Sequence, residues 1–289
     1  MKKIVLFALV LFLLSAAMSS DKPAYKFFDL KGKEAEYKDV LKSALAADLI
    51  FFGEMHNSPI CHWLELELTK DLYAEKKESL VMGAEMFETD NQLILNEYLS
   101  GKIKEKNFEA EAKLWDNYKT DYKPLVVFAL NNKIPFIATN VPRRYASLVN
   151  KAGFEGLDSL SNEAKAFLPP LPVAYDPELK GYKEMMSMMG DSSMHVSPNI
   201  PKAQAIKDAT MAYFILKNLQ EGQVFIHYNG TYHSDNFEGI VWYIRQSRPD
   251  LRIMTISSIE QDDLEKLDGE NSSLADYTLC VPASMSKTY

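Results

Sequence analysis

A short apolar run that ends in a pair of polar side chains sets the strongest constraint on the fold. Leu49 to Phe52 are consecutive apolar residues, which is typical of a strand buried on both faces of a sheet. Gly53 follows, and Glu54 and His56 come where such a strand emerges. Ligands of α/β sheets bind at the carboxyl ends of strands. We therefore expect Glu54 and His56 to point at one place, which makes them a candidate site.

Strand and helix patterns alternate along most of the chain. Apolar runs predict six strands, at Leu49–Phe52, Leu80–Glu85, Pro135–Thr139, Val224–His227, Arg252–Ser257 and Thr278–Val281. After a polar lead-in, the intervening patterns predict helices at Glu34–Ala46, Ile60–Lys76, Asn91–Ser100, Tyr122–Asn131, Arg143–Lys151, Ala203–Leu219 and Asp235–Arg245. Asn57 and Ser58 are typical helix caps, and Pro59 suits a first helical turn. The alternation predicts an α/β fold with a mostly parallel sheet flanked by helices on both faces.

A helical, Met-rich insertion at about residues 160–201 interrupts the alternation, inside a single domain of residues 21–289. Between Leu168 and Pro201 the chain has six prolines and five of its 13 methionines, and no strand pattern. Flexible thioethers suit an adaptable binding surface, although a small helix packed on the main core is an open alternative. Tyr175, Tyr182, Lys183 and His195 flank the methionines and favour binding.

The composition excludes several classes of protein. The 289 residues are 47% hydrophobic and 25% charged, which is ordinary for a globular domain. A net charge of −8 without a Lys/Arg cluster argues against a nucleic-acid partner. The two cysteines, Cys61 and Cys280, are expected to be buried thiols rather than a disulfide, because one lies in a predicted helix and the other in a late strand.

The first 20 residues predict export. Lys2 and Lys3 precede an apolar run from Ile4 to Leu14, as in a secretory signal peptide. Leu14-Ser15-Ala16 is also like the start of a bacterial lipobox, in which Cys would stand at Ala17. Either a peptidase cuts after Ala17, or Ala17 replaces a natural lipid-bearing Cys, so that the protein would be a lipoprotein. We favour the second, because residues 18–21 suit a tether.

Polar side chains follow several predicted strands and define a candidate rim. His56 and His233 each close a G-x-x-H motif after a strand, Glu85 ends another, and Asn140 and Arg143 follow a further one. Glu54, His56, Glu85 and His233 are the residue types that bind a divalent transition metal, and a metal with an open position activates water. Without metal, the same groups suit acid–base chemistry. The alternative is that they are structural groups, with Glu54 capping a helix or pairing with Arg143.

The remaining polar candidates are judged one by one. His62 is expected to be a partly exposed helix residue rather than part of the rim. His227 ends a strand and is expected to be buried, whereas His195 is expected to face a ligand. Asp208 either reaches the rim from the side or is solvated, and the sequence leaves this open.

Five ordered motifs together resemble the ChaN family of haem-binding, iron-regulated bacterial lipoproteins, which is grouped with the Tiki proteases and erythromycin esterases. They are G-E-M-H at Gly53–His56, G-A-E-M-F at Gly83–Phe87, A-T-N-V-P-R at Ala138–Arg143, K-D-A-T-M-A at Lys207–Ala212 and G-T-Y-H at Gly230–His233. The resemblance covers about residues 48–257. It implies an α/β fold with a helical extension, haem as ligand, and iron acquisition at the cell envelope. Metal-dependent members of the superfamily use the histidines of G-x-x-H motifs and a Glu at their sites. The resemblance matches these positions to His56, His233, Glu54 and Glu85.

The chemistry of haem suggests which residues bind it. Ferric iron that must be released suits a Tyr or His ligand, so we expect Tyr182 as axial ligand, with Tyr175 in reserve. Lys183 and His195 would bind the propionates, and Met185 and Met189 would contact the porphyrin. A homodimer would cover the exposed haem face.

Two hypotheses follow. The first is a periplasmic or outer-membrane haem carrier or store, which could exchange haem with an outer-membrane receptor and would touch the membrane only through a lipid anchor. The second is a metal-dependent hydrolase that works at the rim of Glu54, His56, Glu85 and His233.

Overall fold

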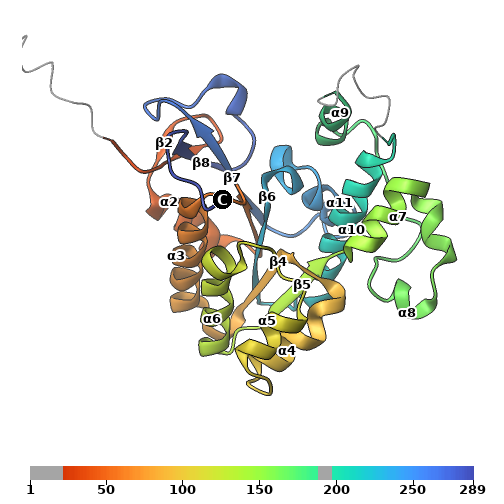
Figure 1. Ribbon diagram of the computed structural model, residues 1–289. Helices are drawn as coiled ribbons and strands as arrows, with labels where there is room; N and C mark the ends of the chain where they lie inside the picture. Colours follow the sequence, from red (N-terminus) through yellow and green to blue (C-terminus); the bar gives the residue numbers. More distant parts are fainter. Residues whose placement is uncertain (1–21, 188–196) are drawn as a thin grey trace, which may run out of the picture.

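The computed structural model describes residues 22–187 and 197–289, built on one mixed sheet with strand order β2-β1-β8-β7-β3-β6-β4-β5 (Figure 1). All six predicted strands are present and run parallel to one another. They are β3 (Leu49–Glu54), β4 (Leu80–Glu88), β5 (Phe136–Asn140), β6 (Val224–Gly230), β7 (Ile253–Gln261) and β8 (Tyr277–Pro282). The predicted α/β class is confirmed.

Two short antiparallel strands at one edge correct the prediction for the start of the domain. β1 (Lys26–Asp29) pairs with β8 and with β2 (Glu34–Ala35). The helix predicted from Glu34 begins instead at Tyr37, as α2 (Tyr37–Ala46), after a capping box between Glu36 and Asp39. Phe27 and Phe28 are both buried in β1, and the pairing of Glu34 and Ala35 with these two residues outweighs their local helical pattern.

The other predicted helices are present, with shifted ends. They are α3 (Pro59–Lys76), capped by Ser58 as predicted, α4 (Gln92–Leu99), α6 (Lys123–Asn132), α7 (Arg143–Ala152), α10 (Ile200–Asn218) and α11 (Ile240–Ser247). α11 begins five residues later than predicted, because Asn236, Phe237 and Gly239 have positive φ angles that an α-helix does not allow. Three short helices were not predicted individually: α5 (Glu105–Glu111), α8 (Asn162–Lys165) and α9 (Lys180–Ser187).

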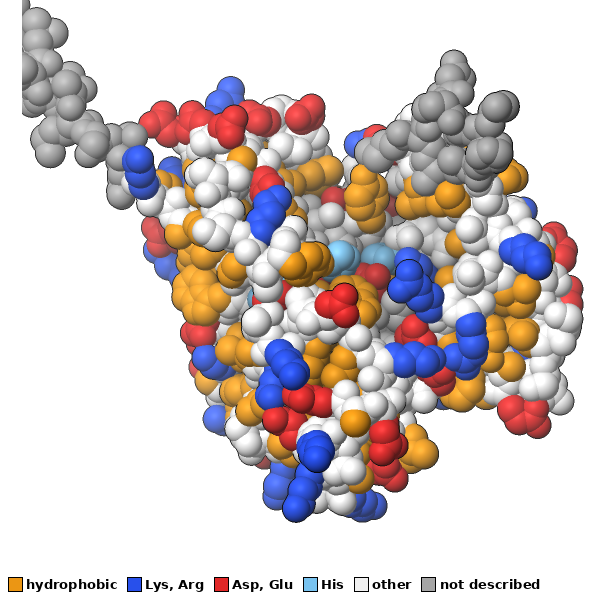
Figure 2. All heavy atoms as spheres, viewed as in Figure 1, with side chains coloured by type: hydrophobic (Ala, Val, Ile, Leu, Met, Phe, Trp, Pro, Cys, Tyr) orange, Lys and Arg blue, Asp and Glu red, His pale blue; other side chains and the backbone are white. Residues whose placement is uncertain are grey.

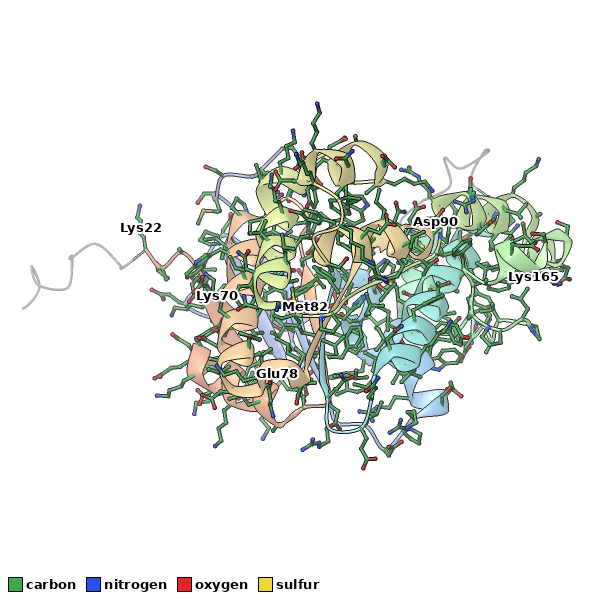
Figure 3. All side chains as sticks on the ribbon, turned by 90° about the horizontal axis from the view of Figure 1, so that it is seen from below. Lys22, Lys70, Glu78, Met82, Asp90 and Lys165 are labelled. Atoms are coloured by element: carbon green, nitrogen blue, oxygen red, sulfur yellow. The ribbon has the colours of Figure 1, made fainter. Side chains whose placement is uncertain are left out.

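Alternate residues of the central strands pack on opposite faces of the sheet. Ile50 and Phe52 belong to the apolar core under α2 to α6, whereas Leu49 and Phe51 belong to the core under α10 and α11. Met82 of β4 lies in the interior of the first core, and Lys165 lies at the periphery (Figure 3). Each fully buried side chain of this size contributes about 1.5–3 kcal/mol, so the central strands are anchored from both sides.

Two further predictions concern the cysteines and the membrane. Cys61 and Cys280 are both buried and free, as expected. Among the described helices, none has both the length and the apolar character needed to cross a bilayer. The predicted signal peptide and lipobox-like segment lie outside the described residues.

Candidate functional site

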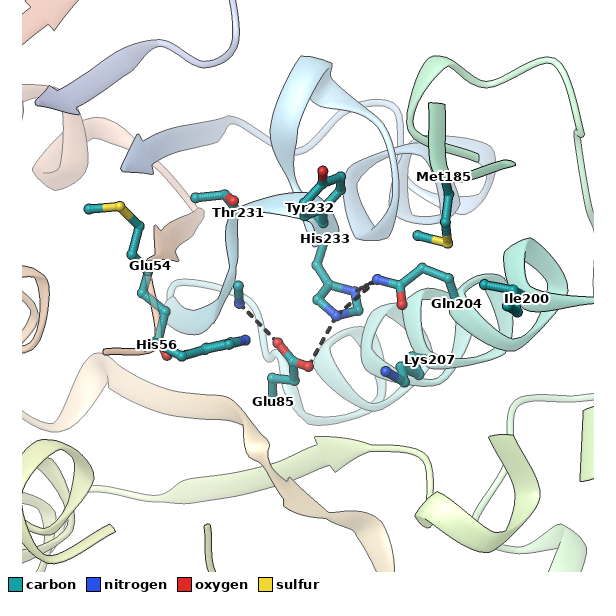
Figure 4. A pocket seen from close by; sticks show the side chains of 12 residues that line it. Glu54, His56, Glu85, Met185, Ile200, Gln204, Lys207, Thr231, Tyr232 and His233 are labelled. Atoms are coloured by element: carbon teal, nitrogen blue, oxygen red, sulfur yellow. Dashed lines mark hydrogen bonds and ion pairs between the residues drawn. The ribbon is translucent and has the colours of Figure 1, made fainter. Parts of the chain in front are cut away.

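Three neighbouring parallel strands bring the predicted rim together. β3 delivers Glu54 and, just beyond its end, His56; β4 delivers Glu85; and β6 leads through Gly230 to His233. Figure 4 shows His56, Glu85 and His233 converging from these strand ends. The expectation of a common polar site at the carboxyl edge of the sheet agrees with this arrangement.

The rim opens into a cleft of about 560 Å³, a size typical of small-molecule sites. In Figure 2 imidazole atoms are visible at the base of this hollow, with hydrophobic side chains around them. The lining combines the rim with residues of α9, α10 and the loop after β6, and consists of Glu54, Met55, His56, Glu85, Met185, Ile200, Gln204, Lys207, Gly230, Thr231, Tyr232 and His233.

His233 lies between two buried carboxylates at the floor of the cleft. Its Nδ1 is 2.5 Å from Asp208 Oδ1, and its Nε2 is 3.1 Å from Glu85 Oε1. Burial opposes a charge on the ring, but the two carboxylates outweigh it and raise the pKa of His233 to about 9. Burial likewise works against Glu85, but the facing His233 holds the pKa of Glu85 below its usual range. The pair is therefore an imidazolium and a carboxylate near neutral pH.

Gly230 holds Glu85 and His56 at close range. The Gly230 N–H donates to Glu85 Oε2 over 2.9 Å. A Cβ at position 230 would lie 2.8 Å from His56 Cε1, so only glycine lets the imidazole lie against the backbone here.

His56 is oriented from behind by Glu54. His56 Nδ1 donates to Glu54 Oε1 over 2.7 Å, and the Trp115 ring meets the imidazole edge to face, with centroids 4.9 Å apart. Burial disfavours charge on His56, but Glu54 raises its pKa. The outer edge of the ring remains open to the cleft, where it can act as an acid, a base or a ligand.

Other sequence candidates have definite places. His62 is buried rather than partly exposed, so that expectation was wrong: one face of α3 packs on the sheet under the rim. His227 is buried, as expected, and its ring nitrogens contact Thr139 and Asn229. Asp208, left open by the sequence, is fully buried beneath His233. Asn140 and Arg143 line a second hollow of about 420 Å³ that shares Glu85, Ile200, Gln204 and Lys207 with the cleft.

The candidate residues of the Met-rich insertion divide into four groups. Met185 of α9 lines the cleft. Tyr182 is buried, its hydroxyl donates to Asp208 Oδ2 over 2.8 Å, and its ring stacks on that of Tyr175. Burial and the Asp208 charge raise the pKa of Tyr182 above the ordinary range of a phenol. Lys183 is exposed and pairs with Glu178. Met189 and His195 lie outside the described residues.

Sequence reasoning did not single out three side chains of the cleft. Gln204 and Lys207 lie one turn apart on α10, and Gln204 contacts the ring of His233. Tyr232 is half-exposed at the mouth. Lys207 and Tyr232 were already inside the K-D-A-T-M-A and G-T-Y-H motifs, so the motifs carried this signal, but only the fold shows that they share a cleft.

Among the described residues, one group of three side chains offers converging metal-ligand atoms: Glu54, His62 and Glu65. It shares Glu54 with the rim but extends behind it, since His62 and Glu65 are buried on α3. The ligand atoms of Glu54, His56, Glu85 and His233 do not converge in this way.

Comparison with known proteins adds a family. The model of a family described as haem-binding uptake, Tiki superfamily, ChaN matches residues 40–244. The fold is similar to that of ChaN of Campylobacter jejuni, solved with cofacial haem, with a TM-score of 0.65, 17% identity, and coverage of 91% of this chain and 98% of that one. The chloroplastic protein RETICULATA-RELATED 5 of Arabidopsis thaliana is 23% identical over 197 residues, 64% of this chain. The match spans only 26% of that plant protein.

Proposed function

The chain belongs to the ChaN family of haem-binding uptake proteins in the Tiki superfamily, and from this premise we propose that it carries haem at the mouth of the cleft between α9, α10 and the strand ends. One observation supports the location: this cleft combines Met185 and Tyr232 with Lys207, and a hollow that contains Arg143 adjoins it. Haem has the same division, with an apolar porphyrin and two carboxylates at one edge.

The apolar part of the proposed site comes from α9 and the loop after β6. Met185 lines the cleft, Met186 is exposed beside it, and Tyr232 is half-exposed. Thioether and aromatic groups pack well on a porphyrin face. Met189, expected from the sequence to join them, stays a proposal.

Basic side chains along α10 and α7 suit the propionates. Lys207 lines both the cleft and the adjoining hollow, which also contains Arg143. Charge-assisted hydrogen bonds from such groups bind carboxylates strongly. We propose Lys207 and Arg143 for this role in addition to Lys183 and His195, because Lys207 lies on the wall of the cleft and Arg143 in the hollow that adjoins it.

Two tyrosines are candidates for the axial ligand. Tyr182, expected from the sequence, has a neighbouring base in Asp208 that could accept the phenol proton, but its oxygen is buried. Iron reaches Tyr182 only if α9 moves away from α10. Tyr232 lies at the mouth of the cleft and needs no such movement, so the geometry favours Tyr232.

A second copy of the chain would cover the outer face of the haem. The relative from Campylobacter jejuni is described as binding haem cofacially, which places two haems face to face. We propose the same arrangement here, because a bound haem at the mouth of this cleft would otherwise expose a large apolar surface. Export, an envelope location, delivery to or from an outer-membrane receptor, and a lipid anchor if position 17 is natively Cys rather than Ala complete the proposal.

Titration of the full chain with ferric haem, followed by absorption spectra and light scattering, tests this proposal. We expect saturable binding, a high-spin charge-transfer spectrum, and dimer formation with haem. Tyr232→Phe should abolish the charge-transfer band, whereas Tyr175→Phe should preserve it; loss of the band in Tyr182→Phe alone would move the ligand to α9. Absence of saturable binding would contradict the proposal.

A metal-dependent hydrolase at the rim is the second candidate, because His56, Glu85 and His233 share one accessible cleft. A metal there would have to displace the proton that Glu85 and Asp208 hold on His233. Activity on ester or peptide substrates that is lost with a chelator and in His56→Ala would support it. If the chelator and His56→Ala both leave haem binding intact, the haem site and the hydrolase site are independent.

A further inference from the structure

A second polar cluster lies behind the rim, between β3 and α3. Glu54 is 3% exposed, His62 5% and Glu65 0%. His62 and Glu65 lie three residues apart on α3, so both side chains are on the face that packs against the end of β3. One ligand atom from each of the three residues lies within 4.8 Å of the other two.

The two ring nitrogens of His62 have different neighbours. Nε2 lies 3.1 Å from the backbone oxygen of His56 and 3.7 Å from Asp121 Oδ2. Both are acceptors, so Nε2 carries a hydrogen. Nδ1 lies 3.0 Å from Glu65 Oε2 and 3.7 Å from Glu54 Oε2. In a neutral ring the Nδ1 lone pair therefore faces two carboxyl groups.

Two oxygens of the cluster have no hydrogen-bond donor among the described residues. They are Glu54 Oε2 and Glu65 Oε1. Glu54 Oε1, by contrast, accepts from Tyr122 over 2.5 Å and from His56 over 2.7 Å. A buried carboxylate oxygen without a partner is costly, so something positive should lie between these groups.

We propose that Glu54, His62 and Glu65 bind one divalent transition-metal ion. One imidazole nitrogen and two carboxylates suit Zn²⁺ and its neighbours better than Mg²⁺ or Ca²⁺, which prefer oxygen alone. His62 Nδ1 is 3.0 Å from the Glu65 oxygen and 3.7 Å from the Glu54 oxygen. These separations allow one ion to lie about 2.1 Å from the nitrogen and from each oxygen. Two carboxylates and one divalent ion are together neutral, which removes the cost of the buried charges.

The outer contacts match those of known metal sites. Ligating histidines commonly donate their other N–H to a carbonyl or carboxylate, as His62 does to the His56 carbonyl. Ligating carboxylates are commonly hydrogen-bonded through the second oxygen, as Glu54 is by Tyr122 and His56. Glu54 also lines the cleft, which gives an ion a route past His56.

A proton is the rival occupant. If Glu65 is protonated, it can share its hydrogen with Glu54, or His62 can carry an extra proton between the carboxylates. Either arrangement would satisfy the cluster without metal. The site does not depend on haem, so its test can fail while haem binding survives.

Metal analysis of the full chain after equilibration with Zn²⁺ and gel filtration distinguishes a metal ion from a proton as the occupant of the cluster. We expect one tightly held zinc per chain, and a zinc X-ray absorption spectrum with a single imidazole ligand. Two imidazoles would place the ion at His56 and His233 and overturn the proposal. Less than a tenth of an equivalent of zinc in the folded chain would also overturn it, in favour of the proton.

Matched variants locate the ion. Glu65→Gln and His62→Gln should each weaken zinc binding at least tenfold. Glu67→Gln, on the same helix but paired with Lys70 near the surface, should leave it unchanged, and so should His233→Gln at the rim. Zinc retained in both Glu65→Gln and His62→Gln would overturn the site even if one variant folds poorly.

Discussion

His233 Nδ1 and Asp208 Oδ1 are 2.5 Å apart in the floor of the cleft, while the other ring nitrogen faces Glu85. The carboxylates hold the proton on His233, so its pKa in the folded chain, about 9, exceeds the ordinary 6.5. A raised pKa stabilises the fold fully below pH 6.5, and this contribution is lost as the pH rises through 9. We expect the free energy of unfolding to fall over this window, on the order of 1–3 kcal/mol.

Urea unfolding at pH 6.5, 8 and 9.5 measures this loss. His233→Gln removes the titrating group, so its stability should vary less with pH over the same range. An equal slope in wild type and variant would show that other groups cause the change. Glu85 has the opposite sign: its pKa is lowered, so its contribution is present above 4.5 and is lost as the pH falls below that value.

Tyr122 and Tyr118 form a matched pair for a buried hydrogen bond. The Tyr122 hydroxyl donates to the Glu54 carboxylate over 2.5 Å, whereas the buried Tyr118 hydroxyl has no partner among the described residues. Tyr122→Phe should destabilise the chain by about 1.5–3 kcal/mol, as expected for a hydrogen bond to a charged group. Tyr118→Phe should be neutral or stabilising, because it removes an unsatisfied polar atom. Chemical denaturation of both variants checks the difference, and equal losses would contradict it.

The parallel core could be predicted from sequence because its strands are short apolar runs whose two faces are both buried. β1 and β2 could not, because KFFD becomes a strand by pairing with β8, a long-range interaction that local pattern does not encode, and Glu34–Ala35 becomes one by pairing with β1. Similarly, the rim of Glu54, His56, Glu85 and His233 was predictable, since strand ends follow apolar runs.

The inner part of the site was less predictable. His62 and Glu65 look like ordinary helix residues, and only the packing of α3 against the end of β3 buries them beside Glu54. Asp208 was undecidable for the same reason, because its place depends on how α10 crosses the sheet. Tyr182 was singled out for its neighbours in sequence, but its hydroxyl contacts Asp208, a residue 26 positions away.

Lys207 should contribute to haem affinity through a propionate. Lys207→Gln keeps a polar side chain, one bond shorter than that of Lys, but removes the charge, and we expect ferric haem to bind about tenfold more weakly, which corresponds to about 1.4 kcal/mol. Lys217→Gln is the control, because Lys217 lies near the other end of α10, over the rings of Tyr213 and Phe214. Equal affinities in Lys207→Gln and wild type would remove Lys207 from the haem site.

Gly53, which joins the apolar part of β3 to Glu54, has no room for a side chain. A Cβ at this position would lie 2.7 Å from the Ile256 backbone oxygen of β7, and backbone of a central strand cannot move aside cheaply. Gly53→Ala should therefore cost at least about 2 kcal/mol of stability, as expected for overpacking in a core. Gly269→Ala is the control, since nothing lies within 4 Å of a Cβ there and the loss of backbone freedom in the unfolded chain should leave it neutral or slightly stabilising. Thermal unfolding of both variants distinguishes the two effects. A Gly53→Ala chain as stable as Gly269→Ala would mean that β3 and β7 can separate at the point where Glu54 enters the site.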